Sequence, residues 1–426
     1  MLENEGNEKS HFFVSVSKNA TEGIFRGYLK IAGVAVMNKT LAGCHSIADL
    51  RRVAKRRLPR AVFDYMDGAA ENEVTLHRNQ ADFSRYELLP RYLTNVEEVD
   101  LSTRVLGADL EVPFVLAPTG MSRLFHHAGE LAVARAAQTA GTLYSLSSMA
   151  TASIEDVAEV AAGPKMMQLY VWRDRGLLKD FMSRARNSGY TALCLTVDFP
   201  TAGQRERDLR NGFTVPPEIR LANVFDTLRR PAWLWNFLVN PRMKLENVSA
   251  HGTAAKNLFS VIDYTTSQFD PSLTWEDMAW MVQEWNGPFA VKGLLSVDDA
   301  KRAADLGVSA VVISNHGGRQ LDHAPSSISV LPEIADALGD RVEIILDGGV
   351  RRGTDVLKAL SLGATAVMIG RAYLFGLGAG GQAGVTRALQ LLTAEIKRNM
   401  MLVGCTSVTA LSKKYIRPYS LGLPAR

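Results

Sequence analysis

The chain contains eight short apolar runs, all of them after residue 111, that are rich in aliphatic and β-branched side chains. Runs that stay apolar for almost their whole length are typical of strands buried on both faces of a parallel sheet, because a strand with one wet face would alternate. The predicted strands are residues 112–118, 142–148, 165–171, 192–198, 289–293, 310–315, 343–349 and 366–371.

Helix-like segments separate most of these strands. Residues 130–139 are rich in alanine, and Ser153 is a predicted N-cap for a helix over residues 154–162. Two further helices are predicted after Ser296 and from Thr354, and each ends at a glycine that can terminate a helix. Strands that alternate with helices in this way predict an α/β fold, the (β/α)8 TIM barrel, with a doubly wound open sheet as the alternative.

One connection, residues 199–288 between the fourth and fifth strands, is much longer than the others. Its last part, SLTWEDMAWMVQEW, predicts a helix, and its earlier part, about residues 205–260, is interpreted as an insertion. Aromatic side chains beside basic ones suit a membrane interface, and the alternative is a flap whose aromatics pack on the barrel. The residues that carry this pattern are Trp233, Trp235, Phe237, Arg229, Arg230, Arg242 and Lys244.

The domain limits follow from where the strand and helix pattern begins and ends. One large domain is expected over residues 45–415, opening with a helical lead-in over residues 45–90. Residues 1–44 are expected to be a disordered extension, and residues 416–426 a C-terminal tail. Met37 precedes a stretch that reads as an ordinary protein start, so translation from Met37 is a second interpretation of the extension.

Composition excludes several classes of protein. The chain has 426 residues, of which 47% are hydrophobic and 22% charged, as is ordinary for a soluble protein with a sizeable core. A net charge of +4 gives no argument for nucleic-acid binding. Three distant cysteines suggest neither disulfides nor a metal site, and no apolar run reaches the ~20 residues of a membrane span. We therefore expect a cytoplasmic protein.

Polar and ionisable residues follow all eight predicted strands. The carboxyl ends of the strands of a barrel lie at one face, which carries the reactive groups, so these residues are expected to meet there. Any one of them alone is more often a helix cap or a turn residue, but the whole set favours a functional site. The residues are Thr119, Gly120, Ser147, Ser148, Gln168, Tyr170, Thr196, Asp198, Lys292, His316, Arg319, Asp347, Gly348, Gly349, Arg351, Gly370 and Arg371.

The stretch SNHGGRQLD, residues 314–322, places a base and a cation directly after a buried strand. His316 can take a proton near neutral pH, and Arg319 presents a planar fork that suits a carboxylate. The two glycines between them allow the turn and leave room for a ligand. The structural alternative is a histidine that satisfies a loop carbonyl and an arginine paired with Asp322.

Two glycine-containing strand ends, LDGGVRRGTD at residues 346–355 and GATAVMIGR at residues 363–371, predict a phosphate site. Barrels often bind phosphate at their last two strand-end loops with backbone N–H groups and a helix N-terminus, and an arginine adds bidentate charge. The alternative is that these glycines and arginines only form ordinary turns.

Two other motifs are set aside. A glycine run at residues 376–381 matches a dinucleotide-binding pattern by letter but lacks the βαβ context. His126–His127 lacks a third metal ligand, so no metal is expected.

These stretches resemble the FMN-dependent L-2-hydroxy-acid oxidase and dehydrogenase family. SNHGGRQLD is similar to the active-site signature of the family, and LDGGVRRGTDVLKALSLGA with IGR resembles its phosphate-binding elements. The shorter motifs PTG, QLYV, LTVD, RERDLRNGF and VKG occur in the family's order, and the likeness runs from about Ile47 to Leu411. The resemblance implies an FMN-binding barrel and an assembly that is commonly a tetramer.

The resemblance also implies catalytic roles. His316 would be the active-site base and Asp198 would hold its imidazolium form. Arg319 would bind the substrate carboxylate, Tyr65 would give that carboxylate a second hydrogen bond, and Tyr170 would face the reacting hydroxyl. Arg205 would lie near the carboxylate as a helper, and Lys292 would stabilise the negative charge of the reduced flavin.

Cofactor contacts come from the same source. Three strand-end side chains would hydrogen-bond the isoalloxazine ring, and two glycines and two arginines would hold the phosphate. The implied FMN-binding residues are Pro118, Thr119, Gly120, Ser147, Gln168, Thr196, Lys292, Ser314, Asp347, Gly349, Arg351, Gly370 and Arg371.

The chemistry agrees with these roles. Oxidation of a 2-hydroxy acid removes two electrons and two protons, and no side chain accepts the electrons, so a cofactor must. The base must be neutral before the reaction and stabilised once protonated. Whether His316 takes the α-proton or the hydroxyl proton during hydride transfer stays open at this point.

Three positions depart from the family pattern. Met149 stands where glycolate oxidases have tryptophan, which makes glycolate a poorer candidate and a larger or different side chain a better one. Gly120 stands where the oxidases commonly have alanine, which resembles the dehydrogenases that use a quinone or cytochrome. Ala69 replaces a more usual glycine with little consequence.

We therefore expect FMN-dependent oxidation of an L-2-hydroxy acid, L-lactate first, with electrons passed to a quinone or cytochrome. The alternatives are an oxidase that produces hydrogen peroxide and an L-mandelate dehydrogenase. Peripheral contact with the inner face of the cell membrane is expected through residues 225–245. Two rivals come from other classes: a catalytically silent FMN-binding protein, and an aldolase or isomerase that uses Lys292 as a Schiff-base amine.

Overall fold

The structure is a computed structural model that describes residues 39–212, 221–239, 244–249 and 269–419. The chain divides into Met1–Gly43 and Cys44–Arg426, and all the elements discussed below belong to the second unit. Most of the expected N-terminal extension, residues 1–38, lies outside the described residues, as does Arg242 of the insertion.

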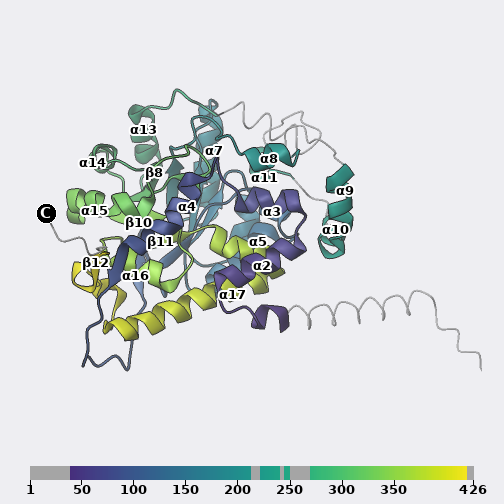
Figure 1. Ribbon diagram of the computed structural model, residues 1–426. Helices are drawn as coiled ribbons and strands as arrows, with labels where there is room; N and C mark the ends of the chain where they lie inside the picture. The colour runs from purple at the N-terminus through teal and green to yellow at the C-terminus, as the bar shows by residue number, and fades with distance from the viewer. Residues whose placement is uncertain (1–38, 213–220, 240–243, 250–268, 420–426) are drawn as a thin grey trace, which may run out of the picture. The chain divides into compact units, whose positions relative to one another are not determined.

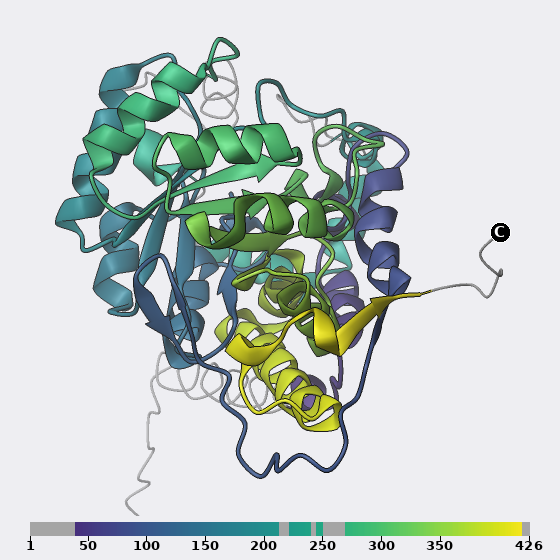
Figure 2. The ribbon, with the colours of Figure 1, turned by 90° about the vertical axis from the view of Figure 1, so that its left-hand side faces the viewer.

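Eight parallel strands form a closed barrel, with the helices arranged around them (Figures 1 and 2). The order around the barrel is β10-β11-β4-β5-β6-β7-β8-β9, so strands consecutive in the sequence are neighbours. The predicted TIM barrel is confirmed, and the open-sheet alternative is wrong. The strands are β4 (Phe114–Leu116), β5 (Tyr144–Ser147), β6 (Lys165–Leu169), β7 (Ala192–Thr196), β8 (Phe289–Leu294), β9 (Ala310–Ile313), β10 (Glu343–Asp347) and β11 (Ala366–Ile369).

The barrel interior is filled by apolar side chains from its strands, such as Val115, Met166 and Ile345. A β-hairpin formed by β2 (Thr103–Val105) and β3 (Ala108–Leu110) adds its own residues to this core. The tight packing inside the barrel leaves the polar residues at the carboxyl ends of the strands, where loops can present them.

The helices between the strands follow the predicted caps closely. Ser153 caps α6 with a reciprocal contact to Asp156, and Ser296 accepts a hydrogen bond from Asp299 N at the start of α14. One start differs: α16 begins at Gly353, before Thr354. The surrounding helices are α5 (Gly129–Thr139), α6 (Ile154–Val160), α7 (Arg175–Asn187), α13 (Trp275–Trp285), α14 (Val297–Asp305), α15 (Ser327–Leu338), α16 (Gly353–Ser361) and α17 (Arg371–Val403).

The glycine run at residues 376–381 lies within α17, which has a kink at Gly380 and Gly381. Gly381 has φ +58°, and a Cβ added there would lie 2.6 Å from the ring of His126. These glycines therefore serve helix packing, in keeping with the rejection of a dinucleotide site.

The lead-in contains α2 (Ile47–Arg57), α3 (Arg60–Asp67) and α4 (Val74–Ala81), and it ends in a strand. That strand, β1 (Tyr86–Leu88), pairs antiparallel with β12 (Ile416–Pro418), so the start of the expected tail is part of the folded unit. In Figure 1, α2 lies along α17.

The described part of the insertion is helical. It contains α8 (Glu206–Arg210), α9 (Leu221–Leu228), α10 (Pro231–Val239) and α11 (Glu246–Ser249). No helix within the described residues is long and apolar enough to cross a membrane.

Candidate active site

A cavity of about 240 Å³ opens at the carboxyl ends of the barrel strands. It brings together most of the predicted site residues, and the others, Asp198, Ser147, Gln168, Thr196 and Ser314, lie at the same strand ends beside them. The predicted residues that line the cavity are Tyr65, Pro118, Thr119, Gly120, Tyr170, Arg205, Lys292, His316, Arg319, Asp347, Gly349, Arg351, Gly370 and Arg371.

His316 occupies a tight turn directly after β9. It has φ +57°, and the two following glycines have φ +65° and +79°, so the chain reverses within three residues. Asn315 stabilises the turn by accepting a hydrogen bond from Gly318 N at 3.1 Å. The turn therefore directs the imidazole into the cavity, which is why two glycines follow it.

His316 forms a pair with Asp198 from the end of β7. Nδ1 of the ring lies 2.9 Å from Asp198 Oδ1, and Nε2 lies 3.5 Å from the Tyr170 hydroxyl. Burial would raise the pKa of Asp198, but His316 and Lys292 hold it below its usual value. An ionised Asp198 fixes the Nδ1–H tautomer, which leaves Nε2 to accept a proton on the cavity side.

Arg319 has no part in the alternative pairing with Asp322. It donates from Nη1 to the carbonyls of Tyr65 and Gly68, at 2.8 and 3.0 Å. Asp322 instead accepts a hydrogen bond from Thr75 N at 2.8 Å, at the start of α4. The structural alternative for SNHGGRQLD is wrong for the arginine.

Two guanidinium groups lie against one tyrosine of the cavity lining. Arg319 lies 5.0 Å and Arg205 5.7 Å from the centre of the Tyr65 ring. Burial and the neighbouring Arg205 lower the pKa of Arg319. Repulsion between these half-buried cations favours the entry of an anion, and the planar forks suit a carboxylate.

Lys292 lies in a buried polar triangle at the ends of β8, β9 and β10. Its Nζ is 3.0 Å from Asp347 Oδ2 and donates to Ser314 Oγ at 2.8 Å, and Ser314 donates to Asp347 at 2.7 Å. Burial would lower the pKa of Lys292, but Asp347 and Asp198 raise it above its usual value. A Schiff-base lysine needs a lowered pKa, so the aldolase reading is disfavoured.

A row of hydrogen-bonded side chains crosses the ends of three adjacent strands. Ser147 donates to Gln168 Oε1 at 3.0 Å, and Gln168 donates to Thr196 Oγ1 at 2.9 Å. The three side chains come from β5, β6 and β7 and are buried. Each fixes the orientation of the next, so the row offers a rigid polar edge of the kind that a planar ligand requires.

Two half-buried arginines, Arg351 and Arg371, line the cavity beside the N-termini of α16 and α17. Burial lowers the pKa of Arg351 to about 10 and that of Arg371 to about 9, and repulsion from Arg319 and then from Arg351 adds to the shift of Arg371. Gly349 has φ +82°, and a Cβ there would lie 1.9 Å from Asn79 O. Paired cations, helix N-termini and a close-packed glycine fit the phosphate of FMN.

Sequence reasoning missed an aromatic wall of the cavity. Phe199 and Phe269 each lie 5.2 Å from the Tyr170 ring, centre to centre, and Phe199 lies 5.9 Å from His316. Phe199 directly follows Asp198 in the sequence, so its place was inferable. Phe269 follows the insertion, where no local pattern indicates a site residue.

Comparisons with known proteins agree with this geometry. The family model described as FMN-dependent dehydrogenase matches residues 54–418. A putative L-lactate dehydrogenase of Mycobacterium tuberculosis is 43% identical over 380 residues, which cover 89% of this chain and 90% of the relative. An L-lactate oxidase of a Nostoc species is 42% identical, with 87% and 97% covered.

Solved structures are similar too. The monotopic membrane protein (S)-mandelate dehydrogenase has a TM-score of 0.86 and 37% identity, and the match covers 88% of this chain and all of the other. At this length and sequence identity, the similarity is one of family and not of fold alone. The chain belongs to the FMN-dependent dehydrogenase family and is a flavoprotein oxidoreductase that uses FMN.

Proposed function

We propose that this protein oxidises an L-2-hydroxy acid, with L-lactate as the first substrate, to the 2-oxo acid, and that its electrons pass to a quinone or cytochrome. The observation that supports this best is one cavity lined by His316, Arg319 and the two arginines of the proposed phosphate site, with Asp198 held against His316 from beside it. Several of the relatives are named for lactate.

Substrate binding rests on charge and stacking. Arg319 and Arg205 attract the substrate carboxylate, and Tyr65 lies against both guanidinium groups. Once the carboxylate is fixed, the carbon that bears the hydroxyl group is held in one orientation. Holding a substrate in its reactive orientation is a large part of what binding contributes to the rate. Phe199 and Phe269 line the same cavity on the side of Tyr170 and add apolar surface to it.

Proton transfer is assigned to His316. Bound FMN supplies the two-electron acceptor. His316 takes a proton at Nε2, and Asp198, 2.9 Å from Nδ1, stabilises the imidazolium that results. Tyr170 lies within 3.5 Å of Nε2 and positions the substrate hydroxyl beside the base.

L-mandelate is the second candidate substrate. Met149 lines the cavity, and a flexible thioether side chain can accommodate a larger substituent. Several of the similar solved structures are mandelate dehydrogenases or oxidases. The rates of flavin reduction by L-lactate and by L-mandelate, measured in parallel, rank the two substrates.

The first test is an anaerobic visible spectrum of the purified holoenzyme. L-lactate is expected to bleach the flavin band, because the base and the carboxylate-binding cations lie in the same cavity. A flavin band that neither L-lactate nor L-mandelate bleaches would contradict the proposal and favour the silent FMN-binding protein. D-lactate serves as the control and is expected to leave the band unchanged.

The electron acceptor is tested separately. Gly120 stands where the oxidases of the family commonly have alanine. A Cβ at Gly120 would lie 3.0 Å from Met149 Cβ, so there is little space for an alanine methyl group here. We expect little hydrogen peroxide per turnover and faster turnover with a soluble quinone. One peroxide per lactate would support the oxidase alternative.

Peripheral membrane contact is proposed for the helices α9 and α10. Phe225, Trp235 and Leu238 are 63%, 62% and 63% exposed, whereas Trp233 turns inward and donates to Leu124 O at 2.8 Å. Exposed aromatic and aliphatic side chains next to arginines suit the interface of an anionic bilayer. The inner face of the cell membrane is the expected surface, and a homotetramer stays the expected assembly.

Replacement of all three exposed side chains by serine is expected to lower binding to phosphatidylglycerol vesicles by about tenfold or more, because that apolar area no longer leaves water. Vesicle co-sedimentation measures this. Leu402→Ser is the matched control, since Leu402 is 64% exposed on the distant helix α17. Equal sedimentation of the triple variant and the wild type would contradict membrane contact through these helices.

A further inference from the structure

The turn between α3 and α4 contacts both of the cation sites in the cavity. Arg319 donates to the carbonyls of Tyr65 and Gly68, and Arg371 donates to the carbonyls of Met66 and Gly68, at 3.1 and 2.7 Å. The Gly68 carbonyl is therefore shared by the carboxylate-site arginine and the phosphate-site arginine. A shift of this turn would move both groups and the Tyr65 ring together.

This turn is strained and rich in negative charge. Glu71 and Glu73 have φ of +46° and +60°, a region that side chains other than glycine rarely adopt. Asp64, Asp67 and Glu73 place three carboxylates within ten residues, and Asp67 and Glu73 are buried. Such a turn keeps its shape only if groups outside it compensate for the strain and the repulsion.

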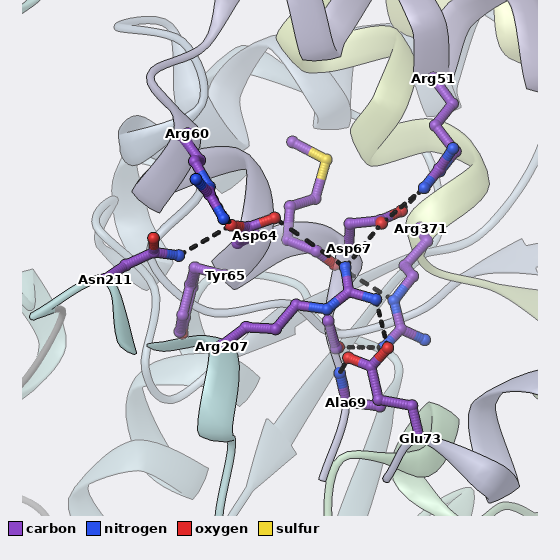
Figure 3. Close-up of polar contacts among 12 residues, drawn as sticks. Arg51, Arg60, Asp64, Tyr65, Asp67, Ala69, Glu73, Arg207, Asn211 and Arg371 are labelled. Carbon is purple, nitrogen blue, oxygen red and sulfur yellow. Dashed lines mark hydrogen bonds and ion pairs between the residues drawn. The ribbon is translucent and has the colours of Figure 1, made fainter. Parts of the chain in front are cut away.

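Arg207 of α8 lies among these carboxylates (Figure 3). Its Nη1 is 3.2 Å from Asp67 Oδ2 and 3.9 Å from Asp64 Oδ1, and its Nη2 donates to Glu73 Oε2. The other oxygen of Glu73 accepts a hydrogen bond from Ala69 N at 2.9 Å. Arg207 thus fixes the turn at both of its ends from outside.

A second cation supports the buried centre of the turn. Arg51 of α2 binds Asp67 in a two-pronged contact of 2.6 and 2.7 Å. Burial would raise the pKa of Asp67, but Arg51, Arg371 and Arg207 together hold it below its usual value. The charge of Asp67 is therefore balanced jointly by the scaffold and by the phosphate site.

We propose that Arg207 is a positioning residue of this enzyme, which holds the Tyr65–Glu73 turn so that Arg319 and Arg371 keep their places in the cavity. Arg207 itself does not line the cavity. It acts through the shared Gly68 carbonyl and the Tyr65 backbone. The part that concerns the hydroxy acid rests on the proposed function, and the part that concerns FMN does not.

The test compares three variants of the full-length holoenzyme. Arg207→Ala is expected to raise the KM for L-lactate and the Kd for pyruvate, read from the shift of the flavin band, by about tenfold, with kcat changed by less than about threefold. The Kd for FMN is expected to rise several-fold. Arg207→Lys keeps the charge but has one nitrogen in place of the two that contact Asp67 and Glu73, so it should restore part of each loss.

Arg210→Ala is the matched control, because Arg210 lies one turn further along the same helix and pairs with Glu206 of that helix. Its constants should equal those of the wild type. Unchanged KM and pyruvate Kd in Arg207→Ala would overturn the inference. So would an equal fall of kcat and thermal stability in both Arg207 variants with no rise in KM, which would indicate a merely structural role.

The two proposals fail in distinguishable ways. If L-lactate and L-mandelate do not reduce the wild-type flavin, the proposed function fails. The positioning role of Arg207 is then tested by the Kd for FMN alone. A higher FMN Kd for Arg207→Ala than for Arg210→Ala supports the positioning role, and equal values overturn it. If Arg207→Ala does not fold, Arg207→Lys carries the same measurements.

Discussion

His316→Asn is expected to slow flavin reduction by L-lactate by about 10²–10⁴-fold while FMN stays bound, because the variant keeps a polar group at the site but loses the proton acceptor. The ring nitrogen Nε2 lies on the cavity side, and Nδ1 is held by Asp198 at 2.9 Å. Stopped-flow measurement of the anaerobic bleaching of the flavin band reports this step directly, without a contribution from the electron acceptor.

His323→Asn is the matched control, since His323 belongs to the same loop but does not line the cavity. Its reduction rate should match that of the wild type. A His316→Asn rate within about tenfold of the wild type would remove His316 from the role of base. Because its pKa is lowered, Asp198 stays ionised at acidic pH. A loss of activity near pH 6 would therefore not come from protonation of Asp198.

Much of the barrel was predictable because its strands are buried on both faces. Burial of this kind produces continuous apolar runs, and the caps at Ser153 and Ser296 mark helix starts by local chemistry. The start of α16 was missed because Asp355 folds back to accept from Arg351 N and Arg352 N, which satisfies the turn before Thr354. The β1–β12 pair joins segments over 300 residues apart, which no local pattern encodes.

The site was predictable to the extent that barrel topology brings strand ends together. The Lys292, Ser314 and Asp347 triangle needs only that β8, β9 and β10 are neighbours. The roles of Phe269 and Arg207 depend on how the insertion returns to the barrel and on how α8 meets α3. Those contacts are set by tertiary packing, and an arginine in a charged helix looks like any solvated residue in the sequence.

Arg351→Met is expected to weaken FMN binding by about 10- to 100-fold, since it removes a charge-assisted hydrogen bond that is typically worth about 1.5–3 kcal/mol. The same change is expected to stabilise the apoprotein. Burial lowers the pKa of Arg351 from its usual value to about 10, so the folded state binds this proton more weakly than the unfolded state does. The protonated group therefore disfavours folding at every pH below about 10, including neutral pH, and this cost fades only as the pH rises above about 10 towards the usual pKa of arginine.

Methionine has a similar length and carries no charge, so the variant removes this cost while it removes the proposed partner of the phosphate. The prediction is thus a split: a higher Tm for the apoprotein at pH 7 and a higher Kd for FMN, measured by thermal unfolding and by flavin titration. Arg352→Met is the control, because Arg352 is half exposed and pairs with Glu395 at 3.0 Å. Its FMN affinity should not change. If Arg351→Met bound FMN as tightly as the wild type, the phosphate would lie elsewhere, and the repulsion between Arg351 and Arg371 would need another anion to balance it.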